Sequence, residues 1–129
     1  MRLLLDTNVF IWLHDSPQRI GEQVMSIVAN PDNDLFLSLT SIWEMQIKIQ
    51  LGKLQLSDSL PEILKTQQVE NNLELLTIAL EHVWALDSLP CHHKDPLDRL
   101  SIAQGQAEGM TLVSADGIFG MYAVELLVV

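Results

Sequence analysis

The sequence predicts an α/β protein of three layers, α/β/α, in which helices cover both faces of a central parallel sheet of four to five strands. Short apolar runs alternate along the chain with longer segments whose apolar residues recur at helical spacing. Runs that are apolar throughout are typical of parallel strands buried on both faces. The length of 129 residues suits one domain, and we expect residues 1–129 to form it.

The first half of the chain contains two strand candidates, each followed by helical sequence. Residues 2–5 and 35–38 are short apolar runs. Apolar residues over 20–28 recur at helical spacing until an Asn-Pro pair stops the pattern. A second helix is expected over 42–50, with its N-cap at the pair Thr40–Ser41.

The second half repeats this alternation. Asp95 followed by Pro96 is a strong start signal, because Asp caps a helix and Pro suits its first position. Asn71 and Asn72 end the helix that precedes them. Strands are therefore expected at 74–78, 111–114 and 125–129, helices at 61–70, 79–86 and 96–108, and a turn or short helix at 116–121.

The composition restricts the class of protein. Seven Lys and Arg stand against 17 Asp and Glu, and the net charge of −10 argues against a protein that holds nucleic acid on a broad basic surface. No apolar run approaches the roughly 18 to 20 residues that span a bilayer, and the chain starts without the pattern of a signal peptide. The single cysteine, Cys91, agrees with a reducing compartment. We therefore expect a cytoplasmic protein.

Four acidic residues lie at or near the carboxyl ends of the predicted strands. Asp6 directly follows a strand and Asp116 comes just after another, while Glu44 and Asp98 lie about one turn into helices. Because parallel strands end at the same edge of a sheet, we expect these carboxylates to converge there. Carboxylate ligands without Cys or His suit a hard ion such as Mg²⁺ or Mn²⁺.

Each of these acids also has a purely structural interpretation. Ser41 and Glu44 have the spacing of a capping box, and Asp98 occupies the third position of a helix. Asp6 and Asp116 could cap whatever follows them. Four converging carboxylates would nevertheless repel one another unless a cation neutralised them, which favours a metal site over four independent caps.

Four motifs in order, LLLDTNVFIW, SIWEMQIKIQLGKL, HKDPLDRLSIAQ and TLVSADGIF, together resemble the PIN-domain ribonucleases, in particular the VapC-type toxins of bacterial type II toxin–antitoxin pairs. The resemblance covers nearly the whole chain. It implies a PIN-like fold in which Asp6, Glu44, Asp98 and Asp116 are catalytic, metal-binding acids, and in which Asn8 and Ser114 orient an acid or a metal-bound water. Ser114 stands where the family usually has threonine, and Asp95 is assigned to capping.

The implied activity is that of a metal-dependent endoribonuclease specific for single strands, a toxin that hydrolyses RNA phosphodiester bonds with Mg²⁺ or Mn²⁺. In this chemistry the ion lowers the pKa of a bound water and neutralises charge on the phosphate. The implied partners are a second copy of the chain and a cognate antitoxin, with a toxin–antitoxin heterotetramer or a larger assembly possible. An Arg or Lys of the antitoxin would compete with the metal.

Weaker signals concern the substrate and the core. Lys48, Lys94 and Arg99 belong to the segments that carry Glu44 and Asp98, and they are candidates for contacts with a substrate phosphate. The loop that contains Cys91, His92 and His93 is expected to border the substrate entrance. Core packing is expected for at least two of the three tryptophans, which are Trp12, Trp43 and Trp84.

Two other functions remain compatible with these residues. A catalytically silent PIN-like regulatory or binding protein would keep the fold and bind only its partner and operator DNA. An aspartate-nucleophile phosphotransferase or phosphatase would use Asp6 at the end of the first strand. Such enzymes usually have a second Asp two residues later, where this chain has Asn8.

Overall fold

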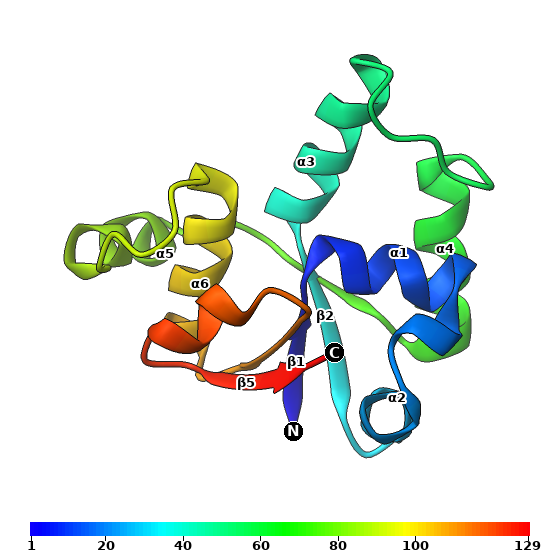
Figure 1. The fold of residues 1–129 in the computed structure, drawn as a ribbon, viewed down its shortest axis with the longest axis horizontal. Helices are drawn as coiled ribbons and strands as arrows, with labels where there is room; N and C mark the ends of the chain where they lie inside the picture. Colours follow the sequence, from blue (N-terminus) through cyan, green and yellow to red (C-terminus); the bar gives the residue numbers. More distant parts are fainter.

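The computed structural model describes residues 1–129 and contains one sheet of five parallel strands in the order β3-β2-β1-β4-β5 (Figure 1). β1 occupies the centre, between β2 and β4. The predicted α/β class with a parallel sheet is confirmed. The strands are β1 (Arg2–Leu5), β2 (Asp34–Ser38), β3 (Glu74–Leu76), β4 (Thr111–Ser114) and β5 (Glu125–Val128).

Six α-helices and three short 3₁₀ turns connect the strands. The helices are α1 (Thr7–Asp15), α2 (Glu22–Val28), α3 (Leu39–Gln50), α4 (Leu60–Asn71), α5 (Leu80–Ala85) and α6 (Pro96–Glu108). The 3₁₀ turns are η1 (Pro17–Arg19), η2 (Leu86–Ser88) and η3 (Gly117–Met121). A membrane-spanning helix is not among them, since none is sufficiently long and apolar.

The two faces of the sheet pack against different helices, because successive side chains of a strand point to opposite faces. Leu3 and Leu5 of β1 belong to a core shared with α1, α2, α3 and α4, whereas Leu4 belongs to a second core shared with α6 and η3. Figure 1 shows α1, α2 and α4 on one side of β1 and β2, with α5 and α6 on the other. This is the expected three-layer arrangement.

The start of α3 differs from the sequence prediction. The N-cap is Ser38, whose hydroxyl accepts the Thr40 N–H at 3.0 Å. Thr40 and Ser41, the predicted caps, are buried in the first turn. The reason is that β2 runs directly into α3 without a loop, so the last residue of the strand is the cap. Glu44 therefore lies beyond the capping positions, and the capping-box interpretation is wrong.

The prediction that at least two tryptophans pack in the core is also wrong. The exposed fraction is 58% for Trp43 and 65% for Trp84. Trp12 is half-buried, and the guanidinium carbon of Arg19 lies 4.3 Å from the centre of one of its rings. Local apolar neighbours predicted burial, but α5 is a short helix with one exposed face, which leaves Trp84 in solvent.

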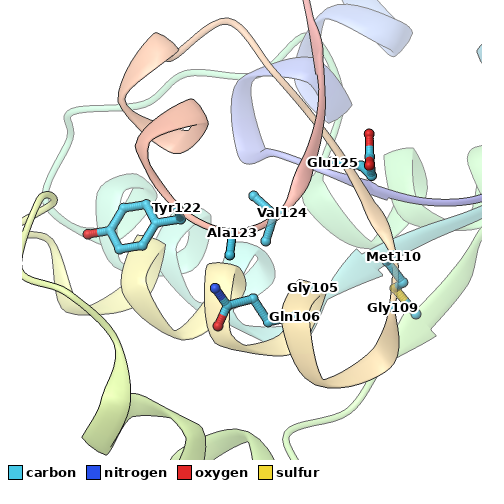
Figure 2. A pocket seen from close by; sticks show the side chains of 8 residues that line it. All are labelled: Gly105, Gln106, Gly109, Met110, Tyr122, Ala123, Val124 and Glu125. Atoms are coloured by element: carbon cyan, nitrogen blue, oxygen red, sulfur yellow. The ribbon is translucent and has the colours of Figure 1, made fainter.

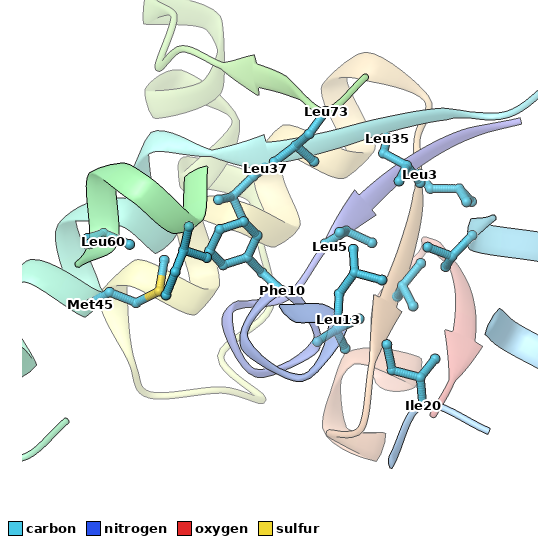
Figure 3. Close-up of a cluster of buried hydrophobic side chains, with 14 residues drawn as sticks. Leu3, Leu5, Phe10, Leu13, Ile20, Leu35, Leu37, Met45, Leu60 and Leu73 are labelled. Atoms are coloured by element: carbon cyan, nitrogen blue, oxygen red, sulfur yellow. The ribbon is translucent and has the colours of Figure 1, made fainter. Parts of the chain in front are cut away.

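Phe10 of α1 is completely buried, and Figure 3 shows its ring among Leu37, Met45 and Leu60. Phe10→Ala should lower the free energy of unfolding by about 3–5 kcal/mol, because the cavity it leaves adds to the lost burial. Urea denaturation would measure this loss. Trp84→Ala is the control, with a change of about 0.5 kcal/mol or less expected at an exposed position. Equal losses in both variants would contradict the assignment of Phe10 to the core.

Candidate active site

The four predicted acids meet at the edge of the sheet where the strands end. Asp6 follows β1 and Asp116 follows β4, two paired strands. The Thr7 hydroxyl at the start of α1 donates to Glu44 Oε1 of α3 at 3.2 Å, which joins this helix to the end of β1. Electrostatic interactions couple Asp98 to both Asp6 and Glu44, and Asp6 to Asp116. The four carboxylates thus lie together at one edge of the sheet, as the sequence predicts.

Asp6 is held by donors on both carboxylate oxygens. Its Oδ1 accepts the Thr7 N–H at 2.8 Å, and its Oδ2 accepts the Ser114 hydroxyl at 2.8 Å. Burial is the main cause of a raised pKa for Asp6, with smaller contributions from the charges of Glu44 and Asp116, while the two hydrogen bonds oppose the rise. Ser114 also accepts the Asp116 N–H at 3.0 Å, so one hydroxyl contacts two of the acids.

Asp98 has the most perturbed carboxyl group in the protein. Its pKa is raised to about 7, first by burial and then by the negative charges of Asp6, Asp95 and Glu44. His93 acts in the opposite direction. A carboxyl that titrates near neutral pH among other carboxyls is typical of a functional site.

Glu44 forms an ion pair within its own helix. Lys48 Nζ lies 2.7 Å from Glu44 Oε2, one turn further along α3. This hydrogen bond is the main cause of the raised pKa of Lys48, so the ammonium group stays charged beside the acids. A contact between Lys48 and a substrate phosphate stays a prediction.

A residue that the sequence did not single out as part of the site, His93, lies between two of the acids. Its Nε2 is 3.0 Å from Asp98 Oδ2 and 3.3 Å from Asp116 Oδ2. The loop was expected to border the substrate entrance, but the histidine reaches the carboxylates themselves. The sequence signal that could have assigned His93 to the site is its position two residues before Asp95, at the start of the motif HKDPLDR.

Asp95 and Arg99 have structural contacts. Asp95 Oδ1 accepts the N–H groups of Leu97 and Asp98 at 2.9 and 3.4 Å, so its predicted capping role is confirmed. The Arg99 guanidinium donates to the backbone carbonyls of Leu89, Pro90 and His93. These bonds hold the loop but leave part of the guanidinium free, so a contact between Arg99 and a substrate phosphate stays a prediction.

Two further predicted residues lie on the surface. Asn8 is exposed in the first turn of α1, and its side chain forms no hydrogen bond within the chain. Lys94 is exposed and forms no ion pair. Their roles towards an acid, a water or a phosphate stay predictions.

A chain of buried and half-buried side-chain hydrogen bonds joins the two helices that carry Glu44 and Asp98. Ser101 of α6 and Thr40 of α3 share a hydrogen bond of 2.7 Å. Thr40 donates to Ser38, and Ser38 donates to Gln104 of α6. Since Thr40 uses its only hydroxyl proton on Ser38, Ser101 is the donor in the first bond. This connection between α3 and α6 sets where the two carboxylates lie.

The donor set suits a hard divalent cation, because it consists of carboxylate oxygens. In their present positions, however, no three carboxylate, imidazole or thiol groups are arranged to hold one ion. Lys48, Ser114 and His93 each form a hydrogen bond with one of the four carboxylates. Binding a cation would therefore require some of these donors to be exchanged for bonds to the ion.

The chain has a separate cavity of about 410 Å³ that involves none of the four acids. Figure 2 shows it between Gln106 and Met110 at the end of α6 and the segment 122–125. Its lining contains no cluster of titratable groups. The chemistry that the sequence predicts belongs to the sheet edge and not to this cavity.

The raised pKa of Asp98 makes a prediction for stability. Between about pH 4 and 7 the folded protein keeps a proton that the unfolded chain has released, so this carboxyl favours folding less and less as the pH rises through that window. In EDTA at pH 8, Asp98→Asn should unfold at a higher temperature than wild type. The free energy of unfolding should rise by about 1–2 kcal/mol, which is less than the full pKa shift would give because solvent screens this half-buried group. The difference should shrink towards pH 4.

Thermal unfolding followed by circular dichroism across this pH range would measure the difference. Asp32→Asn is the control, because Asp32 is exposed and precedes β2, whereas the four acids lie near the carboxyl ends of the strands. This variant should show no such pH dependence. A melting temperature of Asp98→Asn equal to or below that of wild type at pH 8 would contradict the repulsion described here.

The fold of this chain was compared with those of known proteins. A search of curated proteins gives no significant match. Solved structures do match. VapBC2 from Rickettsia felis bound to a promoter DNA fragment has a TM-score of 0.75 at 17% identity over 98% of each chain. VapBC-1 from nontypeable Haemophilus influenzae has a TM-score of 0.67 at 16% identity, over 99% of this chain and 98% of that chain.

A toxin–antitoxin complex from Klebsiella pneumoniae has a TM-score of 0.58 at 20% identity, over 89% of this chain and 87% of that chain. At such identities the likeness establishes the shared fold. The family assignment comes from the sequence, because the model of the PIN domain matches residues 3–125, which include all four acids. The chain that gathers Asp6, Glu44, Asp98 and Asp116 at one sheet edge is a member of the PIN domain family.

Proposed function

We propose that this protein is a metal-dependent endoribonuclease toxin that hydrolyses RNA phosphodiester bonds and is inhibited by a cognate antitoxin. The observation that carries the proposal is the convergence of four carboxylates at the sheet edge, with the pKa of Asp98 raised to about 7. Gathering these charges destabilises the folded chain, which is expected of a site built for a cation. The protein would act in the cytoplasm as a homodimer.

Asp6, Glu44, Asp98 and Asp116 are the residues that would hold Mg²⁺ or Mn²⁺. When bound, the ion would supply an activated water and neutralise charge on the phosphate. The chain contributes the orientation of its acids. Ser114 holds Asp6 through its hydroxyl and receives the Asp116 N–H, so both acids have fixed directions before substrate arrives.

The substrate would be held through its phosphates by few contacts. Lys48, Lys94 and Arg99 are the candidates, and Arg99 also donates to backbone carbonyls of its loop. With a net charge of −10, the protein offers RNA no wide basic face. We therefore expect weak binding of single-stranded RNA that depends on salt, with the metal ion supplying most of the local positive charge.

Cleavage of RNA tests the proposal directly. Purified protein should cut single-stranded RNA in the presence of Mg²⁺ or Mn²⁺ and should be inactive in EDTA. Asp6→Asn and Asp98→Asn should each lower the cleavage rate by at least about 100-fold, because removal of a charged ligand weakens the electrostatic stabilisation of the transition state. Fragment analysis on denaturing gels measures the rate.

The control for this experiment is Asp32→Asn, which removes a negative charge from an exposed position and should cleave at the wild-type rate. Circular dichroism would show that each variant is folded. Full activity of either active-site variant would remove that acid from the site. A folded wild-type protein that cuts no RNA at high metal would favour the silent regulatory protein instead.

Inhibition by an antitoxin makes a second prediction. The structures from Rickettsia felis and Klebsiella pneumoniae are described as a VapBC2 bound to promoter DNA and a toxin–antitoxin complex, and we carry the partner over to this chain as a proposal. A C-terminal antitoxin peptide that contains Arg should inhibit cleavage, and rising Mn²⁺ should relieve the inhibition, because guanidinium and metal compete for the carboxylates. Replacing that Arg by Ala should weaken inhibition at least about 10-fold. Inhibition insensitive to Mn²⁺ would contradict this competition.

A further inference from the structure

His93 is the only imidazole that contacts any of the four acids, and it contacts two of them. Its Nε2 lies within hydrogen-bonding distance of one oxygen on each of two carboxylates, Asp98 Oδ2 at 3.0 Å and Asp116 Oδ2 at 3.3 Å. The two acids come from different elements, α6 and the end of β4. His93 therefore connects two parts of the site that the backbone does not join.

The histidine is fixed by contacts on every side. Its backbone N–H donates to the Tyr122 hydroxyl at 2.6 Å, and its carbonyl accepts from Arg99 at 3.4 Å. Its ring packs against Phe119, with 5.7 Å between the ring centres. The side chain is 15% exposed. These contacts set the direction of the ring.

The hydrogen bonds also determine which ring nitrogen carries the proton. Nδ1 faces the backbone N–H of Asp95 at 3.1 Å. Because an N–H can only donate, Nδ1 is an acceptor and the proton of the neutral ring lies on Nε2. The imidazole thus directs its Nε2 N–H group at Asp116, while Asp98 Oδ2 lies 3.0 Å from the same nitrogen. It has no free lone pair with which to bind a cation.

The remaining oxygens of these two acids differ. Asp116 Oδ1 accepts the Ile118 N–H at 3.0 Å, so both oxygens of Asp116 have donors within the chain. Asp98 accepts no hydrogen bond within the chain on either carboxylate oxygen, but its Oδ2 lies 3.0 Å from His93 Nε2. The contact with His93 therefore places one Asp98 oxygen beside the imidazole, and the other oxygen is left for a ligand.

We propose that His93 is a positioning residue that holds Asp98 and Asp116 in the orientation required for binding a divalent cation. The inference rests on the proposed function, since it assigns His93 a part in the same metal site. It differs from a ligand role, because Nδ1 accepts the Asp95 N–H and Nε2 carries the proton, which is directed at Asp116. Donors that orient the carboxylate ligands of a metal typically change its affinity by 10–100-fold.

The test is binding of Mn²⁺ alone, measured by isothermal titration calorimetry on the full chain without RNA. His93→Leu keeps apolar bulk beside Phe119 but removes the donor, and it should weaken Mn²⁺ binding about 10-fold or more. His93→Gln carries an amide N–H at about the reach of Nε2 and should bind Mn²⁺ within about threefold of wild type. Cys91→Ala is the control in the same loop, at an exposed residue, and should bind like wild type.

The result that supports the inference is loss of affinity in His93→Leu with recovery in His93→Gln. Unchanged or tighter Mn²⁺ binding in a folded His93→Leu protein would overturn it, because the histidine would then be a spectator or a competitor of the ion. If His93→Leu fails to fold, weak binding by folded His93→Gln would overturn it instead. Wild-type protein that binds no Mn²⁺ would reject the proposed function together with this inference, so the two failures are distinguishable.

Discussion

The repulsion between carboxylates at one sheet edge is the constraint on which this structure depends. Burial and neighbouring negative charges raise the pKa of Asp98 to about 7, and they raise that of Asp6 as well. Hydrogen-bond donors of the chain partly offset this repulsion. Asp6 accepts from the Thr7 N–H and the Ser114 hydroxyl, and Glu44 accepts from the Lys48 ammonium. These bonds keep the acids oriented while their charges remain only partly compensated.

The rest of the fold maintains this arrangement. β1 lies at the centre of the sheet with both faces buried, so the position of Asp6 is fixed by two cores at once. The side-chain hydrogen bonds between α3 and α6 hold together the two helices that carry Glu44 and Asp98. A buried polar network whose members are all satisfied favours one arrangement of the helices, since any shift leaves a donor or acceptor unpaired.

The acidic composition excludes a broad basic surface, yet it is compatible with chemistry on a phosphodiester. The excess of negative charge is partly a property of the site itself, where carboxylates are the functional groups. A bound divalent ion would reverse the local field at that edge. An acidic enzyme of this kind would use its metal for attraction to phosphate and would offer a favourable surface to a basic inhibitory segment.

The sequence by itself determined the succession of strands and helices along the chain and the parallel sheet, because these follow from local periodicity. It also indicated that the four acids meet, because parallel strands end at one edge of a sheet. Only the tertiary structure decided which donors face the acids. Ser38 caps α3 since β2 leads into it directly, Arg99 turns to loop carbonyls, and His93 reaches two carboxylates. Such contacts depend on how segments far apart in the chain pack together. The sequence around each residue does not show which distant segment that residue will contact.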